Sequence, residues 1–371
     1  MYNSPLKLLY KDIFENTYLF KGFSLHMFIN DFLMAIFFLV AGLEIKHEIL
    51  HGSLSSFKEA SFPIIASIGG VVVPALIFIF FNKDTPFLGG FCIPISTDIA
   101  FAVGVFLIFS KKLNPSLKVF LLSLAVVDDL ISILAIGIVY SIDINTHYLS
   151  LAILVFMTLV IANKLFNIQS ITYYLLAGLC LWYFIYLSGV HCTISGVLLA
   201  ITIPTSHSNG ISSLEKLQRL LVPINSLIII PLFAFANTGI SLAYNIDLST
   251  SIASTLYKGI ILGLCVGKPL GIMIFSYIGD LTGITEKPSN ISWFAVFLVS
   301  LIAGIGFTMS IFVSEIAFVN DFTLINIAKS SILMSSIISI LSTYIVITIY
   351  DILRKLNNRP KTRLINKYYI S

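Results

Sequence analysis

The sequence has few charged residues. Only 11% of its 371 residues are charged, whereas 57% are hydrophobic. A soluble domain carries about a quarter charged residues, so this composition excludes an ordinary soluble protein. Eleven membrane spans of about 20 residues would use roughly 220 residues, close to 60% of the chain, which matches the hydrophobic fraction. The composition therefore predicts a polytopic membrane protein.

Cysteine is also scarce, and its pattern excludes two further classes. The four cysteines form no CxxC pair and have no histidine cluster beside them, so neither a disulfide scaffold nor a zinc site is predicted. We expect buried free thiols that act as small hydrophobic side chains. The cysteines are Cys92, Cys180, Cys192 and Cys265.

What the sequence does contain is a series of apolar runs without the period-two alternation of a β-barrel, which favours an all-α protein. We predict one transmembrane domain over residues 1–371, with an external N-terminal segment (1–26) and a basic cytoplasmic tail (351–371). The longest connection is expected over the polar stretch Thr205 to Leu221. The runs fall near residues 27–44, 60–82, 92–110, 116–140, 148–165, 172–189, 191–204, 222–244, 255–279, 291–316 and 327–350.

The distribution of lysine and arginine predicts the orientation. Six cations follow the last run, and alternation through eleven spans places 15 cations on their side and 6 on the other. Positive residues gather on the cytoplasmic side, so we expect a cytoplasmic C-terminus in the inner membrane and no nucleic-acid binding. An odd number of spans leaves the N-terminus outside although it carries lysines, which belong on the cytoplasmic side. We therefore expect that the beginning of the chain is incomplete. The six are Arg354, Lys355, Arg359, Lys361, Arg363 and Lys367.

Four charged residues lie inside the apolar runs. They are Asp98, Asp128, Asp129 and Lys268. A charge at mid-bilayer costs at least about 2.5–3.5 kcal/mol, so such residues indicate a function. For Lys268 alone, the alternative is a side chain that reaches the membrane interface.

The adjacent acids predict a site that exchanges cations for protons. Neighbouring residues on a helix point about 100° apart, so Asp128 and Asp129 cannot both face one partner. Two desolvated carboxylates resist ionising together, and a cation, a lysine or a proton relieves that repulsion. The competing interpretation is an ion pair that only packs helices.

Two interruptions predict broken helices. Pro94 to Asp98 interrupts one run, and Gly304 to Thr308 interrupts another. Irregular backbone at membrane depth is tolerated where protein or a water-filled cavity satisfies it. The freed N-terminal ends can be balanced by an acid such as Asp98, and the freed C-terminal carbonyls by a cation such as Lys268.

With these segments in place, the chain resembles the NhaA family of bacterial Na⁺/H⁺ antiporters. The resemblance covers residues 28–350, with the motifs in family order. They are Gly42-Leu-Glu-Ile-Lys46, Ser96-Thr-Asp-Ile-Ala-Phe-Ala102, Val127-Asp-Asp-Leu130, Ser188-Gly-Val-His191, Leu232-Phe-Ala-Phe-Ala-Asn237, Gly267-Lys-Pro-Leu-Gly271 and Gly304-Ile-Gly-Phe-Thr-Met-Ser310.

The resemblance implies inverted repeats, two broken helices that cross at mid-membrane, and a first helix missing from the family's twelve. It also implies roles for individual residues. Asp128 and Asp129 would bind Na⁺ and carry protons, supported by Thr97, Asp98 and Lys268 and by the broken-helix residues Gly304, Gly306 and Thr308. Glu44 and Glu48 would serve the pH response, unless they form only a solvated helix end, and His191 matches a histidine that is equally well explained by packing.

We therefore expect a secondary transporter, and not an enzyme, that extrudes cytoplasmic Na⁺ or Li⁺ in exchange for external protons. Two protons per Na⁺ are implied by the resemblance, with a role in pH and sodium homeostasis. No cofactor is expected, the surroundings are membrane lipid, and a homodimer is left open. The rival functions are an intramembrane aspartyl protease using Asp98 and Asp128, and a passive cation channel.

Overall fold

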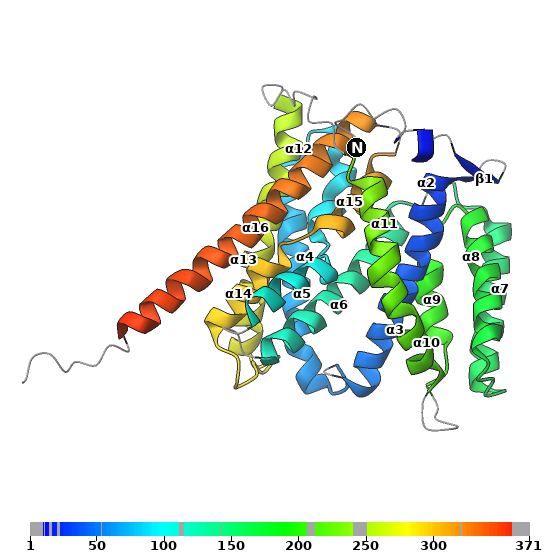
Figure 1. Ribbon diagram of the computed structural model, residues 1–371, viewed down its shortest axis with the longest axis horizontal. Coiled ribbons are helices and arrows are strands. Elements are labelled where there is room, and N and C mark those ends of the chain that lie inside the picture. The colour runs from blue at the N-terminus through cyan, green and yellow to red at the C-terminus, as the bar shows by residue number, and fades with distance from the viewer. Residues whose placement is uncertain are drawn as a thin grey trace, which may run out of the picture.

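The computed structural model describes residues 10, 12–14, 17–20, 23–52, 54–110, 115–141, 143–205, 212–239, 251–319 and 321–357. In these residues the fold is all-α apart from one small hairpin (Figure 1). Its strands are β1 (Tyr18–Phe20) and β2 (Phe23–Ser24), which pair antiparallel. The predicted basic tail beyond 357 and most of the predicted 1–26 segment lie outside the described residues.

The first half of the chain contains one broken span and several continuous helices. α2 (Leu25–Met27) continues through the π-helical turn η1 (Phe28–Leu33) into α3 (Met34–His51). Then follow α4 (Phe57–Asn82), the 3₁₀-helix η2 (Pro86–Ile95), α5 (Ile99–Ile108), α6 (Pro115–Val139), α7 (Thr146–Lys164), α8 (Ile171–Leu187) and α9 (Ile194–Thr202).

The second half repeats the use of π-helical turns and contains the second broken span. α10 (Ser213–Ile224), η4 (Asn225–Ile229) and α11 (Ile230–Asn237) form one span. α12 (Ser251–Leu262), η5 (Gly263–Gly267) and α13 (Lys268–Leu281) form the next. α14 (Trp293–Ala303), α15 (Phe307–Ala317) and α16 (Phe322–Asn357) complete the described chain.

Each of the eleven predicted apolar runs corresponds to helix. Seven helices of the described chain are long and apolar enough to cross a membrane, and the two broken pairs raise the number to nine. The other two runs are shorter helices: α8 has 17 residues and α9 has nine. Nine residues rise about 14 Å, roughly half of a bilayer's hydrocarbon thickness, so α9 alone does not make the full span expected over 191–204.

Two details of the sequence prediction were wrong. The stretch Thr205 to Leu221 is not a connection throughout, because α10 begins at Ser213. Ser212 caps this helix by accepting a hydrogen bond from the Glu215 N–H, and Leu217 is buried, so an amphipathic turn precedes the apolar run. Cys180 is exposed on α8 and not buried as expected, although all four cysteines are free thiols.

Both predicted helix breaks are confirmed. η2 and α5 are bent by 43° across Ser96 to Asp98, and α14 and α15 by 47° across Gly304 to Gly306. The first half of the first broken span, η2, is a 3₁₀-helix and not an α-helix. These broken spans, together with α4, α6 and α13, form the centre of the molecule, while α16 and the pair α7 and α8 lie at opposite sides (Figure 1).

Close backbone contact holds α4 against α13. A Cβ atom on Gly69 would collide with the backbone carbonyl of Gly271, and a Cβ on Gly271 would collide with the carbonyl of Gly69. Small residues of this kind allow helices to approach closely in a membrane. The contact fixes α4 beside Lys268, the first residue of α13.

Candidate functional site

The site begins where the two broken spans meet. The backbone N–H of Asp98 donates to the Ile305 carbonyl at 2.8 Å, and Thr97 Oγ1 donates to the Ala303 carbonyl at 3.1 Å. Each break therefore supplies hydrogen-bond partners for the irregular backbone of the other. This is the arrangement that irregular backbone needs at membrane depth.

The Asp98 side chain caps both helices that restart after the breaks. Its Oδ1 accepts from the Phe101 N–H at 3.1 Å, in the first turn of α5. Its Oδ2 accepts from the Thr308 N–H at 3.0 Å and from the Thr308 hydroxyl, in the first turn of α15. A negative charge at two helix N-termini is electrostatically favourable, as the sequence predicted.

Lys268 occupies the complementary position. Its Nζ donates to the carbonyl of Ile95, the last residue of η2, at 2.5 Å, and lies 3.0 Å from Asp128 Oδ2. Neither side chain of this ion pair is exposed. The predicted contacts of Lys268 with a freed carbonyl and with an acid are both present, and the side chain does not reach toward an interface.

Asp128 is surrounded by donors from three elements. Its Oδ2 accepts from Thr97 Oγ1 at 2.8 Å and from Lys268, while its Oδ1 accepts from the hydroxyl of Ser67 on α4. Sequence reasoning missed Ser67. The available signal was a hydroxyl inside an apolar run, two residues before the Gly69-Gly70 pair.

Asp129 differs sharply from its neighbour. It is 1% exposed, and neither carboxylate oxygen has a hydrogen-bond partner in the described part of the chain. Asp98, Asp128, Lys268 and Glu44 are all close enough to act on it electrostatically. A buried carboxylate without donors requires a proton or a cation, so this arrangement can hold either one.

Glu44 and Glu48 lie on the last two turns of α3, and both are half-buried. Lys46, between them, has a different role, because its Nζ donates to the carbonyls of Ile201 at 2.6 Å and Ile203 at 2.5 Å. It therefore caps the C-terminal end of α9. Gly42, in the same motif, lies against Ala200 and Val197 of α9.

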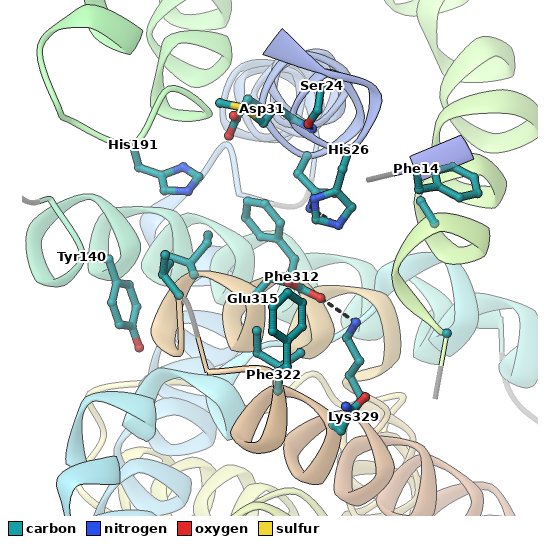
Figure 2. A pocket seen from close by; sticks show the side chains of 18 of the residues that line it. Phe14, Ser24, His26, Asp31, Tyr140, His191, Phe312, Glu315, Phe322 and Lys329 are labelled. Atoms are coloured by element: carbon teal, nitrogen blue, oxygen red, sulfur yellow. Dashed lines mark hydrogen bonds and ion pairs between the residues drawn. The ribbon is translucent and has the colours of Figure 1, made fainter. Parts of the chain in front are cut away.

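A cavity of about 700 Å³ lies beyond the site, toward the hairpin (Figure 2). Its ionisable lining includes Asp31, His191 and the ion pair between Glu315 and Lys329, whose Oε1 and Nζ atoms are 2.5 Å apart. His191 accordingly lies at the cavity, where its Nδ1 is 2.9 Å from Thr193 Oγ1, and not among the core acids.

Aromatic side chains close the cavity toward the core. The Phe312 ring, which is 1% exposed, lies with its centroid 5.7 Å from that of Phe38, 5.6 Å from His191 and 5.9 Å from Phe233. We call Phe38, Phe233 and Phe312 the aromatic plug. Because Phe312 follows Thr308 by one turn of α15, the plug lies between the crossing and the cavity.

Helix α6 gives the thickness of this barrier. Tyr140, immediately after α6, lines the cavity, and Asp129 lies eleven residues earlier. Eleven helical residues rise about 16 Å. The intervening Ile133 and Ile136 are buried in the same hydrophobic cluster as the plug.

Comparisons with known proteins agree with this geometry. The family described as Na⁺/H⁺ antiporter 1 matches residues 1–347. The Na⁺/H⁺ antiporter NhaA of Helicobacter acinonychis is 44% identical, over 86% of this chain and 82% of the relative. The NhaA of Pelagibacter ubique is 43% identical, over 93% and 90%, and NhaA 2 of Aliarcobacter butzleri is 45% identical, over 85% and 81%. With its two broken spans in contact and a family match over residues 1–347, the chain belongs to the NhaA-type Na⁺/H⁺ antiporter family.

Proposed function

We propose that this protein extrudes cytoplasmic Na⁺ or Li⁺ across the inner membrane in exchange for external protons. The observation that carries the proposal is Asp129, a buried carboxylate that has no donor among the described residues and lies beside the ion pair of Asp128 and Lys268. A group of this kind is neutralised by either ion, so each ion displaces the other. The names of the relatives support the same exchange.

Exchange follows from alternate access to this site. Facing the cytoplasm, Na⁺ displaces protons from Asp128 and Asp129; facing outward, protons displace Na⁺. Two protons per Na⁺ move one net charge in each cycle, which is worth about 2.3 kcal/mol per 100 mV of membrane potential. Voltage and the proton gradient then both drive Na⁺ out, as sodium and pH homeostasis require.

The two routes to the site lie at opposite ends of α3. From the basic C-terminal tail we infer that the Glu44 and Glu48 end faces the cytoplasm. The cavity lined by Asp31 and Glu315 is then the external vestibule, closed by the aromatic plug.

The geometry favours exchange over the two rival functions. Asp98 and Asp128 do not share a proton as a protease dyad does, because Thr308 occupies one carboxylate and Ser67, Thr97 and Lys268 occupy the other. A passive channel needs a continuous aqueous path, whereas the plug and the buried Ile133 and Ile136 separate Asp129 from the vestibule.

Replacing Asp129 with Asn is expected to abolish Na⁺-dependent proton movement, because an amide cannot hold the proton that Na⁺ displaces. The measurement is the dissipation of ΔpH in everted vesicles after addition of Na⁺, Li⁺ or K⁺. Asp84→Asn, at an exposed position, is the matched control and should exchange at the parent rate. Exchange near the parent rate in Asp129→Asn would exclude this site.

Lys268 and Asp128 should behave as one electrostatic unit. Lys268→Ala leaves a buried charge without its cation, a loss of about 3–5 kcal/mol. The double variant Asp128→Asn with Lys268→Gln removes acid and base together, and the Gln amide can still donate to the Ile95 carbonyl. It should be more active than Lys268→Ala and should exchange one proton per Na⁺ without voltage dependence. Unchanged voltage dependence in proteoliposomes would show that the second proton uses another group.

We also propose that Glu44 and Glu48 set the pH response through the negative potential of the cytoplasmic mouth. At saturating Na⁺, replacing both with Gln should lower the pH of half-maximal exchange by about 0.5 unit or more. A less negative mouth concentrates fewer protons, so the site loses its protons at a lower bulk pH. Maximal turnover should stay within about twofold. Loss of turnover at every pH would instead indicate a structural role.

Phe312→Ala should open the plug and weaken coupling. We expect an uncoupled ²²Na⁺ leak about fivefold above the parent, since the cavity left by the ring thins the apolar barrier between the vestibule and the site. Phe80→Ala, which removes the same ring from a 71% exposed position, is the control. A leak equal to that of the control would place the external barrier elsewhere.

A further inference from the structure

Ser67 on α4 donates its hydroxyl to an acidic side chain of another helix. Buried hydroxyls on helices commonly donate to a carbonyl of the same helix. Ser61, Ser123 and Ser331 do so, donating to the carbonyls of the third or fourth preceding residue. Ser67 is completely buried on α4 and donates instead across the interface to Asp128 Oδ1 on α6.

The position of Ser67 is fixed by the tightest helix contact near the site. Gly69 and Gly271 bring the backbones of α4 and α13 together, so α4 cannot slide or rotate freely. A Cβ on Gly70, three residues after Ser67, would lie 3.9 Å from Asp128 Oδ1. Ser67 and Gly70 share one face of α4, so this face lies against the Asp128 carboxylate. The hydroxyl is therefore held at Asp128 by the backbone and not by a flexible side chain.

The donors of Asp128 are divided unevenly between its two oxygens. Thr97 and Lys268 both contact Oδ2, and within the described residues Ser67 is the hydrogen-bond donor to Oδ1. Two donors on one oxygen leave the carboxylate free to swing about that point. A third donor on the other oxygen fixes its plane.

We propose that Ser67 is a positioning residue for the ion site: it holds Asp128 Oδ1 toward α4 and so leaves Asp129 as the carboxylate that meets the cation. This assignment rests on the proposed Na⁺/H⁺ exchange. It gives the two adjacent acids different tasks by geometry. Asp128 keeps a fixed orientation when it takes or releases its proton, and Asp129 is the carboxylate that meets the cation.

The proposal predicts a change in affinity without a matching change in turnover. In Ser67→Ala, Asp128 Oδ1 loses its donor, so the carboxylate must be ordered around each incoming ion. The apparent KM for Na⁺ should rise about tenfold or more, the size expected for one buried hydrogen bond to a charged group. The kcat should stay within about twofold of the parent.

The matched control is Ser276→Ala. Ser276 is also completely buried, but its hydroxyl has no hydrogen-bond partner in the described chain, and it lies about 12 Å along α13 from Lys268. Its removal tests for the general effect of deleting a buried hydroxyl, and its KM should equal that of the parent. Ser67→Thr keeps the hydroxyl and should restore KM to within about twofold of the parent.

The measurements are Na⁺ titrations of ΔpH dissipation in proteoliposomes, with the amount of inserted protein determined for each variant. A raised KM confined to Ser67→Ala supports the positioning role. A parent-like KM in Ser67→Ala, an equal rise in Ser276→Ala, or a Thr variant as impaired as Ala would overturn it. If the parent itself shows no Na⁺-dependent ΔpH change, the proposed function fails, and the assignment of Ser67 to a Na⁺ site fails with it.

Discussion

The bidentate capping by Asp98 is the interaction on which the rest of the site depends. One carboxylate satisfies the N-terminal ends of α5 and α15 and thereby holds the two breaks against each other. With the breaks fixed, the carbonyl of Ile95 is freed from regular helix and presented to Lys268. Lys268 then neutralises Asp128, and within the described residues Asp129 is left without a donor. The contacts that begin at Asp98 therefore satisfy every charge of the site except Asp129.

Much of this series of contacts could be predicted because burying a charge in an apolar membrane span costs free energy. Asp98, Asp128, Asp129 and Lys268 stand out against their surroundings, and proline and glycine mark the two breaks. The contacts between the breaks and these charges follow from electrostatics, so the structure confirms them.

Other features could not be predicted because their signal is not local. Ser67 is one hydroxyl among many in apolar helices, and only the packing of Gly69 on Gly271 brings it to Asp128. The cavity combines residues from both ends of the chain, such as Asp31 and Lys329. The start of α10 could not be predicted from hydropathy, because the first turns of this helix carry many polar residues. The signal that hydropathy does not include is the capping residue Ser212.

Helix α3 joins features that have so far been treated separately. It carries Phe38 in the aromatic plug and Glu44 six residues later, about 9 Å further along one continuous helix. Lys46 clamps the same helix to the end of α9. The aromatic plug and the Glu44 end of α3 are therefore parts of one rigid element, so a shift at one is carried to the other without an intervening loop.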